Sequence, residues 1–465
     1  MRWFLALIIA ALLAGCSIPE PLVERIKDEG TLLVITRNSP TTYYEGPQGY
    51  KGFEYELVEM FAKELGVKVK YIIPDSFADI LPMITRGEAH LAAAGLTMTP
   101  KRETMVRFSP SYQQITQQVI YRSGNKRPRK IMDTVSGTLE IIAGSSHEEQ
   151  LEKLREKHPE LKWIAQADLE SEELLYLVNE QVIDYTIADS NEAALSLQLY
   201  ADLKVAFDLT EPQPLAWAFQ HAEDSSLYDA AAAFIEEQKK NGALKQLIER
   251  YYGHVKRLGF VDKRTFTRHI AKRLPDLMPL FQRAGEKTDL DWQLLAAIGY
   301  QESHWNPKAV SPTGVKGIMM LTNATAKQLD IEDRTDPAQS IMGGARYVRL
   351  VEKKLPKRIK NPDRLWLALA GYNVGYGHLE DARILTQRGG GNPDKWADVK
   401  QYLPLLSQEK HFKTVKHGYA RGREPVTYVD NIRNYYELLV WHNQQQAPPV
   451  EKPKEPLKVT TPAML

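Results

Sequence analysis

One carboxylate in the chain has the placement of a catalytic acid. The residues after Asp289 and Asp291, either of which can serve as the N-cap, have the pattern of a helix over 292–303. An apolar stripe runs along that helix, formed by Trp292, Leu295, Ala296 and Gly299. The stripe carries Glu302 toward the interior, where burial disfavours the charged carboxylate. We therefore expect its pKa to be raised toward the value of roughly 6 to 7 that suits a general acid.

The plain alternative for Glu302 is a helix-end glutamate that is capped or salt-bridged at the surface. The segment 303–329 after it contains no Asp or Glu, whereas ordinary glycoside hydrolysis places two carboxylates across the scissile bond. A lone acid favours a reaction in which the substrate supplies its own nucleophiles. Acids that are distant in the sequence can still fold back beside Glu302, so a pair of carboxylates stays open.

Three ordered motifs raise Glu302 above that alternative. They are Glu302-Ser-His-Trp-Asn-Pro307, Ser311-Pro-Thr-Gly-Val-Lys-Gly-Ile-Met-Met320 and Ala370-Gly-Tyr-Asn-Val-Gly-Tyr-Gly377. Over roughly residues 280 to 440 the chain resembles the soluble-lytic-transglycosylase family, whose fold is mainly α and similar to goose-type lysozyme. The resemblance implies that Glu302 protonates the β-1,4 glycosidic oxygen between N-acetylmuramic acid and N-acetylglucosamine in peptidoglycan. The muramyl acetamido oxygen and C6 hydroxyl then act in turn, which leaves a 1,6-anhydro end without using water.

The same resemblance implies a set of substrate-binding residues, namely Ser311, Met319, Met320, Tyr372, Asn373, Glu424 and Tyr428. Ser311 would contact the acetamido group, and Met319 would form part of the groove wall. Tyr372 would position the acetamido region or the catalytic carboxyl group, while Tyr428 would lie beside that carboxyl group and Glu424 would support the groove. Taken singly, Ser311-Pro-Thr-Gly314 is also ordinary turn chemistry, and Tyr372-Asn373 is also a plain helix end before the turn at Gly375 and Gly377. Met320 stands where the family usually has glutamine, and Gly371 where alanine is usual.

The N-terminal half has a different pattern. Residues 31–253 alternate short apolar strands with amphipathic helices, which predicts an α/β fold in two lobes with largely parallel sheets. Strands are expected at 32–35 and 67–71, with a helix over 53–65 that Gly66 ends. Further strands are expected at 141–143, 162–165, 185–188 and 204–207, and a capping box at Ser146 and Glu149 begins a helix. The basic stretch 122–130 is expected to be a solvated interlobe loop rather than a binding patch.

Three segments of this half resemble family 3 periplasmic solute-binding proteins, over roughly residues 30 to 253. They are Gly52-Phe-Glu-Tyr-Glu-Leu57, Ala92-Ala-Ala-Gly-Leu-Thr-Met-Thr-Pro-Lys-Arg102 and Phe108-Ser-Pro-Ser-Tyr112. The resemblance implies a site for an amino acid or peptide, in which Arg102 and Thr97 hold the α-carboxylate and Asp189 holds the amino group. A guanidinium pairs well with a carboxylate, and the two lobes would close on the ligand about a hinge. The alternative is that Arg102 caps a helix or pairs with Glu103 at the surface, and that the lobes are purely structural.

The first residues have the pattern of a secretion signal. The apolar run from Trp3 to Leu13 is shorter than the roughly 20 residues that span a bilayer, but it suits a signal peptide. Leu13-Ala-Gly-Cys16 resembles a bacterial lipobox, which implies a lipid anchor on Cys16, and Ser17 after it favours the outer membrane. The alternative is an ordinary signal peptide with an incidental thiol. Cys16 is the only cysteine, so no intrachain disulfide can form.

Charge and composition exclude several classes of function. Lys and Arg total 60 against 59 Asp and Glu, so the net charge of +1 gives no field that gathers nucleic acid. The 11 histidines show no metal-ligand spacing, and the chain has no phosphate-binding glycine loop or nucleophile elbow. We expect no metal and no other cofactor.

The sequence therefore predicts four segments: a lipoprotein signal peptide (1–15), a two-lobed solute-binding-like domain (21–258), a lysozyme-like transglycosylase domain (266–446) and a disordered tail (447–465). The favoured function is a murein-cleaving enzyme whose binding domain regulates or targets it. The alternatives are a non-catalytic glycan- or amino-acid-binding lipoprotein with a degenerate lysozyme-like domain, and a true hydrolase that admits water.

Overall fold

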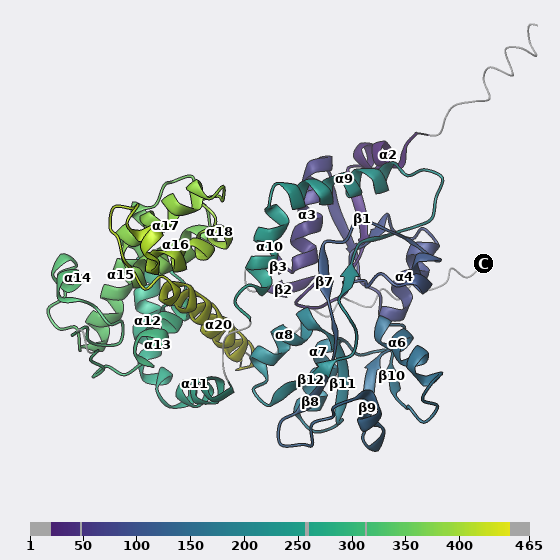
Figure 1. The fold of residues 1–465 in the computed structure, drawn as a ribbon, viewed down its shortest axis with the longest axis horizontal. Helices are drawn as coiled ribbons and strands as arrows, with labels where there is room; N and C mark the ends of the chain where they lie inside the picture. The colour runs from purple at the N-terminus through teal and green to yellow at the C-terminus, as the bar shows by residue number, and fades with distance from the viewer. Residues whose placement is uncertain (1–19, 47–48, 256–259, 312–313, 447–465) are drawn as a thin grey trace, which may run out of the picture. The chain divides into compact units, whose positions relative to one another are not determined.

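The computed structural model of the chain describes residues 20–46, 49–255, 260–311 and 314–446 (Figure 1). Inter-residue contacts divide the chain into a first unit, Met1–Thr265 with Leu355–Asp430, and a second unit, Phe266–Lys354 with Asn431–Leu465. The predicted signal peptide, the lipobox and the C-terminal tail lie outside the described residues.

The first lobe contains a five-stranded sheet in the order β4-β1-β5-β14-β6. Its strands are β1 (Thr31–Ile35), β4 (Lys68–Ile72), β5 (Leu91–Ala92), β6 (Arg107–Phe108) and β14 (Ala218–Phe219). The first three in that order are parallel, and β14 is antiparallel to both neighbours. Its helices and 3-10 turn are α2 (Leu22–Glu29), α3 (Phe53–Leu65), η1 (Phe77–Asp79), α4 (Ile80–Thr85), α5 (Pro100–Glu103), α9 (Ser226–Lys240) and α10 (Ala243–Tyr252). In Figure 1, α2, α3 and α9 lie beside these strands.

The predicted strand-helix-strand unit of this lobe is confirmed. Helix α3 ends at Gly66, which adopts the left-handed conformation with φ 78°. Its buried face, which includes Leu57, Val58 and Phe61, packs into a core with Trp217 and Phe234. Burying one such large apolar side chain contributes about 1.5–3 kcal/mol. This unit also contains a hairpin that was not predicted, formed by β2 (Tyr44–Gly46) and β3 (Gly49–Lys51).

The second lobe contains a sheet in the order β10-β9-β11-β8-β12. Its strands are β8 (Gln117–Arg122), β9 (Leu139–Ile142), β10 (Ile164–Gln166), β11 (Tyr185–Asp189) and β12 (Leu203–Asp208), so all four predicted strands are present. Its helices and 3-10 turn are η2 (Ile131–Ser136), α6 (Ser146–Arg155), α7 (Ser171–Asn179) and α8 (Ser190–Leu199). Strand β8 was not predicted, and it runs antiparallel to β11 and β12. Because β14 is likewise antiparallel to its neighbours in the first lobe, both sheets are mixed rather than largely parallel as expected.

Two short strands connect the lobes. Strand β7 (Gln113–Ile115) leads into the second lobe and pairs antiparallel with β13 (Gln213–Leu215), which leads back. The interpretation of the basic stretch 122–130 as an interlobe loop is therefore wrong, because it connects β8 to η2 within the second lobe. Two of its arginines have structural partners: Arg122 pairs with Asp202, and Arg127 donates to the carbonyl oxygen of Ala206.

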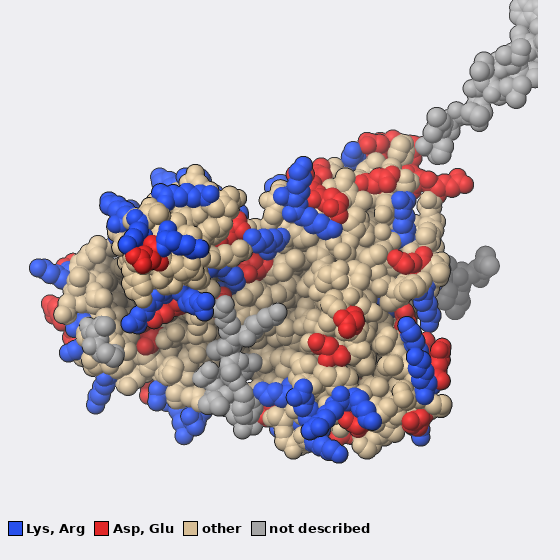
Figure 2. All heavy atoms as spheres, viewed as in Figure 1, with Lys and Arg blue, Asp and Glu red and all other residues tan. Residues whose placement is uncertain are grey.

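The remainder of the described chain is helical, as predicted, apart from isolated β-bridges of Lys316 with Val310 and Leu321. The helices are α11 (Phe260–Lys272), α12 (Leu274–Thr288), α13 (Trp292–Ser303), α14 (Asn323–Gln328), α15 (Pro337–Lys354), α16 (Asp363–Val374), α17 (Tyr376–Arg388), α18 (Trp396–Tyr402), η3 (Leu403–Ser407), α19 (Glu409–Phe412) and α20 (Arg423–Gln446). Figure 2 shows acidic and basic side chains mixed over the visible face, in keeping with the balanced net charge.

Candidate functional site

Helix α13 carries Glu302 in its last turn. Asp291 is the N-cap, and its side chain accepts a hydrogen bond from the Gln293 amide at 2.8 Å. The Asp291 carboxylate also accepts from the hydroxyl of Tyr436 on α20 at 2.7 Å. Of the two predicted N-caps, Asp291 is therefore correct. These two contacts hold the start of the helix that positions Glu302.

The predicted single apolar stripe on α13 is wrong in its extent. Every residue from Leu294 to Tyr300 is buried, because the middle of the helix is enclosed rather than covered on one side. Trp292, which was assigned to the stripe, is only half-buried. Glu302 is itself half-buried, beyond the end of this enclosed stretch.

The chain turns back sharply after Glu302. His304 and Trp305 both adopt left-handed conformations, with φ of 51° and 60°. The Trp305 indole is 2% exposed, and its Nε1 donates to the carbonyl oxygen of Ala296 at 2.7 Å. The Ser303 hydroxyl lies 2.9 Å from the carbonyl oxygen of Ile318. The end of α13 is thus tied both to its own preceding turns and to the second motif.

The second motif packs against α13 behind Glu302. Met319 is fully buried, and its amide donates to the Ser340 hydroxyl at 3.2 Å. A Cβ on Gly299 would lie 3.3 Å from the Met319 sulfur, so the two residues pack closely. Met320 is half-buried with φ 46°. Ser311 accepts a hydrogen bond from the Val315 amide at 3.2 Å.

The remaining predicted substrate residues belong to the first unit. Tyr372, in the last turns of α16, stacks on Tyr428 of α20, with ring centroids 6.3 Å apart and 16° between the ring planes. Tyr428 is 4% exposed, whereas Asn373 is exposed. Glu424 is also exposed, and it pairs with Arg421 at 3.3 Å. The structure therefore brings the two tyrosines together and leaves Glu424 at the surface.

The predicted ligand residues of the two lobes line one small cavity. Thr97, Arg102 and Asp189 surround a volume of about 20 Å³, together with Arg37, His147 and Glu192 among others. This volume holds about one water molecule. Arg102 is 1% exposed, so the alternative of a surface pair with Glu103 is wrong.

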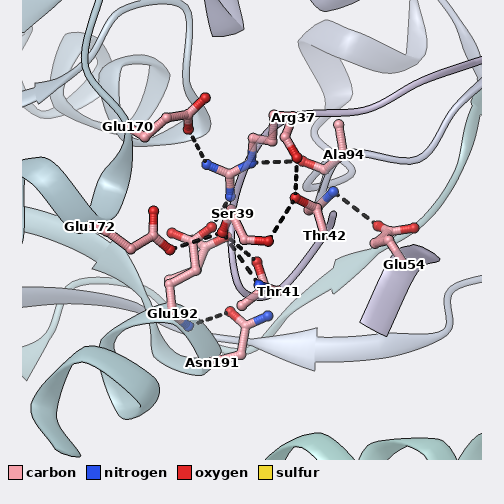
Figure 3. A network of polar contacts seen from close by, with 12 residues as sticks. Arg37, Ser39, Thr41, Thr42, Glu54, Ala94, Glu170, Glu172, Asn191 and Glu192 are labelled. Carbon is pink, nitrogen blue, oxygen red and sulfur yellow. Dashed lines mark hydrogen bonds and ion pairs between the residues drawn. The ribbon is translucent and has the colours of Figure 1, made fainter. Parts of the chain in front are cut away.

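A cluster of acidic residues, which was not predicted, surrounds Arg37. The Arg37 guanidinium pairs with Glu170 at 3.0 Å and with Glu192, and Glu172 accepts from the Ser39 hydroxyl at 2.9 Å (Figure 3). Burial raises the pKa of the Glu172 carboxyl group above its usual value, and the charge of Arg37 opposes that shift. No sequence spacing connects these residues, because the acids follow Arg37 by more than 130 positions.

Glu54 is a further buried acid beside this cluster, inside the first quoted motif. It accepts hydrogen bonds from the Gly95 amide at 2.9 Å and the Trp217 indole at 2.8 Å, and from the Tyr112 hydroxyl. Burial raises the pKa of the Glu54 carboxyl group, while these hydrogen bonds act in the opposite direction. Its presence in the motif was the only sequence signal for it.

Comparison with known families matches both halves of the chain. Residues 32–254 match the bacterial extracellular solute-binding proteins, family 3. Residues 279–394 match the transglycosylase SLT domain.

Curated relatives match nearly the whole chain. A protein of Saccharophagus degradans named membrane-bound lytic murein transglycosylase F is 49% identical over 94% of this chain and 87% of its own. A protein of the same name from Stutzerimonas stutzeri is 46% identical over 96% of this chain and 92% of its own. Among solved structures, a mutant of ArgBP from T. maritima aligns with 50% of this chain over 99% of its own length, with 23% identity and a TM-score of 0.45.

Proposed function

This chain belongs to the membrane-bound lytic murein transglycosylase F family, and on that premise we propose that Glu302 is the acid and base with which it cleaves murein. The family makes the protein a lytic transglycosylase that acts on peptidoglycan and carries a solute-binding-like domain. Within the proposal, the first domain spans 21–258 and the transglycosylase domain spans 266–446.

The proposed reaction uses Glu302 twice. Its carboxyl group first donates a proton to the glycosidic oxygen between N-acetylmuramic acid and N-acetylglucosamine, and the bond from that oxygen to the muramyl C1 breaks. The muramyl acetamido oxygen bonds to C1 and compensates the positive charge there. The C6 hydroxyl oxygen then attacks C1 and displaces the acetamido oxygen, while Glu302 takes the hydroxyl proton. The product is a 1,6-anhydro end, and Glu302 is protonated again.

The placement of Glu302 is the observation that supports this proposal. It is a half-buried carboxylate at the end of an enclosed helix, followed by the Trp305 turn and the packed second motif. We propose that Ser311, Met320, Tyr372, Asn373, Glu424 and Tyr428 bind the substrate or support its groove. For Met319, full burial favours a role in packing the groove wall from behind.

The products of murein digestion test the reaction. Purified sacculi incubated with the protein are expected to release muropeptides with 1,6-anhydro ends, identified by mass spectrometry from their mass, which is lower by one water. Reducing ends would instead indicate a hydrolase. Absence of any release would favour the alternative of a non-catalytic glycan- or amino-acid-binding lipoprotein.

The first domain is proposed to bind a small ligand that regulates or targets the enzyme. Arg102 and Thr97 would hold the carboxylate of an amino acid or peptide, and Asp189 would hold its amino group. The convergence of these three residues on one cavity supports this assignment. A guanidinium offers a carboxylate two parallel hydrogen bonds, which makes Arg102 the main determinant.

The protein is associated with a membrane, as the family name states. Within the described residues, none of the helices has the length and apolar character needed to cross a bilayer. We propose that acyl chains on Cys16 anchor the protein to the periplasmic face of the outer membrane. Each buried CH₂ of such a chain adds about 0.8 kcal/mol to membrane binding.

Replacing Cys16 by alanine is therefore expected to move the protein from the membrane fraction to the soluble periplasm, because the attachment atom is lost. The measurement is immunodetection of the protein in separated membrane and periplasmic fractions. A Ser17→Ala variant keeps the thiol and serves as the control, which is expected to stay with membranes. Retention of the Cys16→Ala variant in the membrane fraction would disprove the lipid anchor.

A further inference from the structure

Helix α6 contacts both of the charged groups that are proposed to hold a ligand. Glu149 accepts a hydrogen bond from Nε of Arg102 at 2.7 Å. His147, two residues earlier on the same helix, places its Nε2 3.0 Å from Oδ1 of Asp189. A carboxylate and an imidazole of the chain are thus bound to the same two charged side chains that are proposed to hold the carboxylate and the amino group of a ligand.

The contact of Glu149 reproduces how a ligand carboxylate would be held. One of its oxygens accepts from Arg102, and the other accepts from the Thr99 hydroxyl at 2.7 Å. The remaining guanidinium nitrogens of Arg102 donate to the carbonyl oxygens of Thr97 and Gly144, at 3.3 and 3.0 Å. Three of the five N–H groups of the Arg102 guanidinium therefore have partners within the protein, and Glu149 is the charged one among these partners.

This contact also joins the two lobes. Arg102 and Thr99 belong to the first lobe, whereas Glu149 belongs to the second. The pairs of Arg37 with Glu170 and Glu192 cross between the lobes in the same way (Figure 3). With a cavity of about 20 Å³ between them, the lobes are closed around their own side chains.

A buried guanidinium needs such a partner. Arg102 is 1% exposed, and a charge left without a counter-charge in the interior is strongly destabilising. Glu149 supplies that counter-charge from the other lobe. A ligand carboxylate that takes the place of Glu149 on Nε of Arg102 has to compete with it, and this competition lowers its apparent affinity.

We propose that His147 and Glu149 form an internal pseudo-ligand, which holds the two lobes together and which competes with a carboxylate-bearing amino acid or peptide for Arg102. This inference rests on the proposed ligand site of the first domain, and it adds how that site is regulated. It assigns no role to the residues around Glu302.

Lobe closure is tested with distance measurements on the full chain. Cys16→Ser removes the only native thiol, and spin labels are attached to cysteines introduced at the exposed Glu64 of the first lobe and Lys157 of the second. Electron-spin resonance then gives the distribution of distances between the lobes without added ligand. We expect one short distance in the otherwise native chain and an additional longer population after Glu149→Gln.

Glu152→Gln is the matched control. Glu152 lies on the same helix and also pairs across the lobes, with Lys101 at 3.5 Å, but both side chains of this pair are exposed. Exposed pairs contribute little, so this variant is expected to keep the native distribution. A Glu149→Gln variant that also keeps the native distribution would overturn the inference.

Calorimetry with L-alanine, L-glutamate, L-lysine and L-alaninamide tests the displacement. The carboxylate-bearing probes are expected to bind the Glu149→Gln variant at least about tenfold more tightly than the native chain, given the strength of a charged hydrogen bond. L-alaninamide, which lacks the carboxylate, should show no such gain. Equal affinities for both chains would overturn the inference while leaving the ligand site in place. Absence of binding to both chains would instead contradict the proposed ligand site. The spin-label distances would then be the test of whether Glu149 holds the lobes together.

Discussion

Replacing Glu302 by glutamine is expected to lower the rate of 1,6-anhydro end formation from murein by about 10²- to 10⁴-fold. Glutamine has nearly the same shape as glutamate, so the half-buried end of α13 keeps its packing. The amide can neither donate the proton to the leaving sugar nor take the proton of the C6 hydroxyl. Both steps of the proposed reaction are therefore lost with one substitution.

The rate is measured by mass spectrometry of muropeptides released from sacculi, and thermal unfolding shows that the fold is kept. Glu286→Gln is the control. Glu286 is an exposed acid on the neighbouring helix α12, and its replacement by glutamine removes one negative charge, as Glu302→Gln does. A Glu302→Gln variant that forms anhydro ends at the native rate would show that another group moves the proton.

Replacing Trp305 by alanine is expected to destabilise the end of α13 by about 3–5 kcal/mol, the usual cost of deleting a buried aromatic side chain. The indole is 2% exposed and packs against Tyr300 and Phe266, with ring centroids 4.7 and 5.6 Å apart. Its Nε1 also holds the carbonyl oxygen of Ala296. Alanine would leave a cavity beside the turn that follows Glu302, and murein cleavage is expected to fall with the loss of that support.

Hydrogen exchange of the amides in α13, followed by mass spectrometry, measures this local stability. A loss of about 3 kcal/mol corresponds to exchange that is roughly 100-fold faster, because each 1.4 kcal/mol is a factor of ten. Val310→Ala is the control, since Val310 is 58% exposed in the same unit and loses little packing. Unchanged exchange in the Trp305→Ala variant would mean that other contacts hold the end of the helix.

The strands and helices whose formation depends on residues close together in the chain were predictable from the sequence. The strand at 32–35, the helix over 53–65 with its stop at Gly66, and the helix over 292–303 are confirmed in nearly the same positions. Capping, turn formation and hydrophobic periodicity all act over a few residues, so their signals are present in the sequence itself. The motifs around Glu302 and Arg102 also predicted the two families, whose signals are likewise local runs of residues.

A helix start was predicted one residue too late where two neighbouring serines can both serve as the N-cap. Helix α6 begins one residue earlier than predicted, because Ser145 rather than Ser146 accepts from the backbone, in this case from Glu148. This shift has a large consequence. Glu149, which the predicted capping box would have bound back to its own helix, is released to reach Arg102 in the other lobe.

The identity of the charged partners was decided by the tertiary structure alone. Arg37 meets Glu170 and Glu192, and Arg102 meets Glu149, across separations of 47 residues or more. The chain contains 59 acidic residues, and which of them faces a given arginine depends on how β7 and β13 set one lobe against the other. The local sequence determined the helices, the strands and the motifs around Glu302. The pairing of Arg102 with Glu149 follows only from how the two lobes meet, because electrostatic pairing depends on distance in space and not on spacing along the chain.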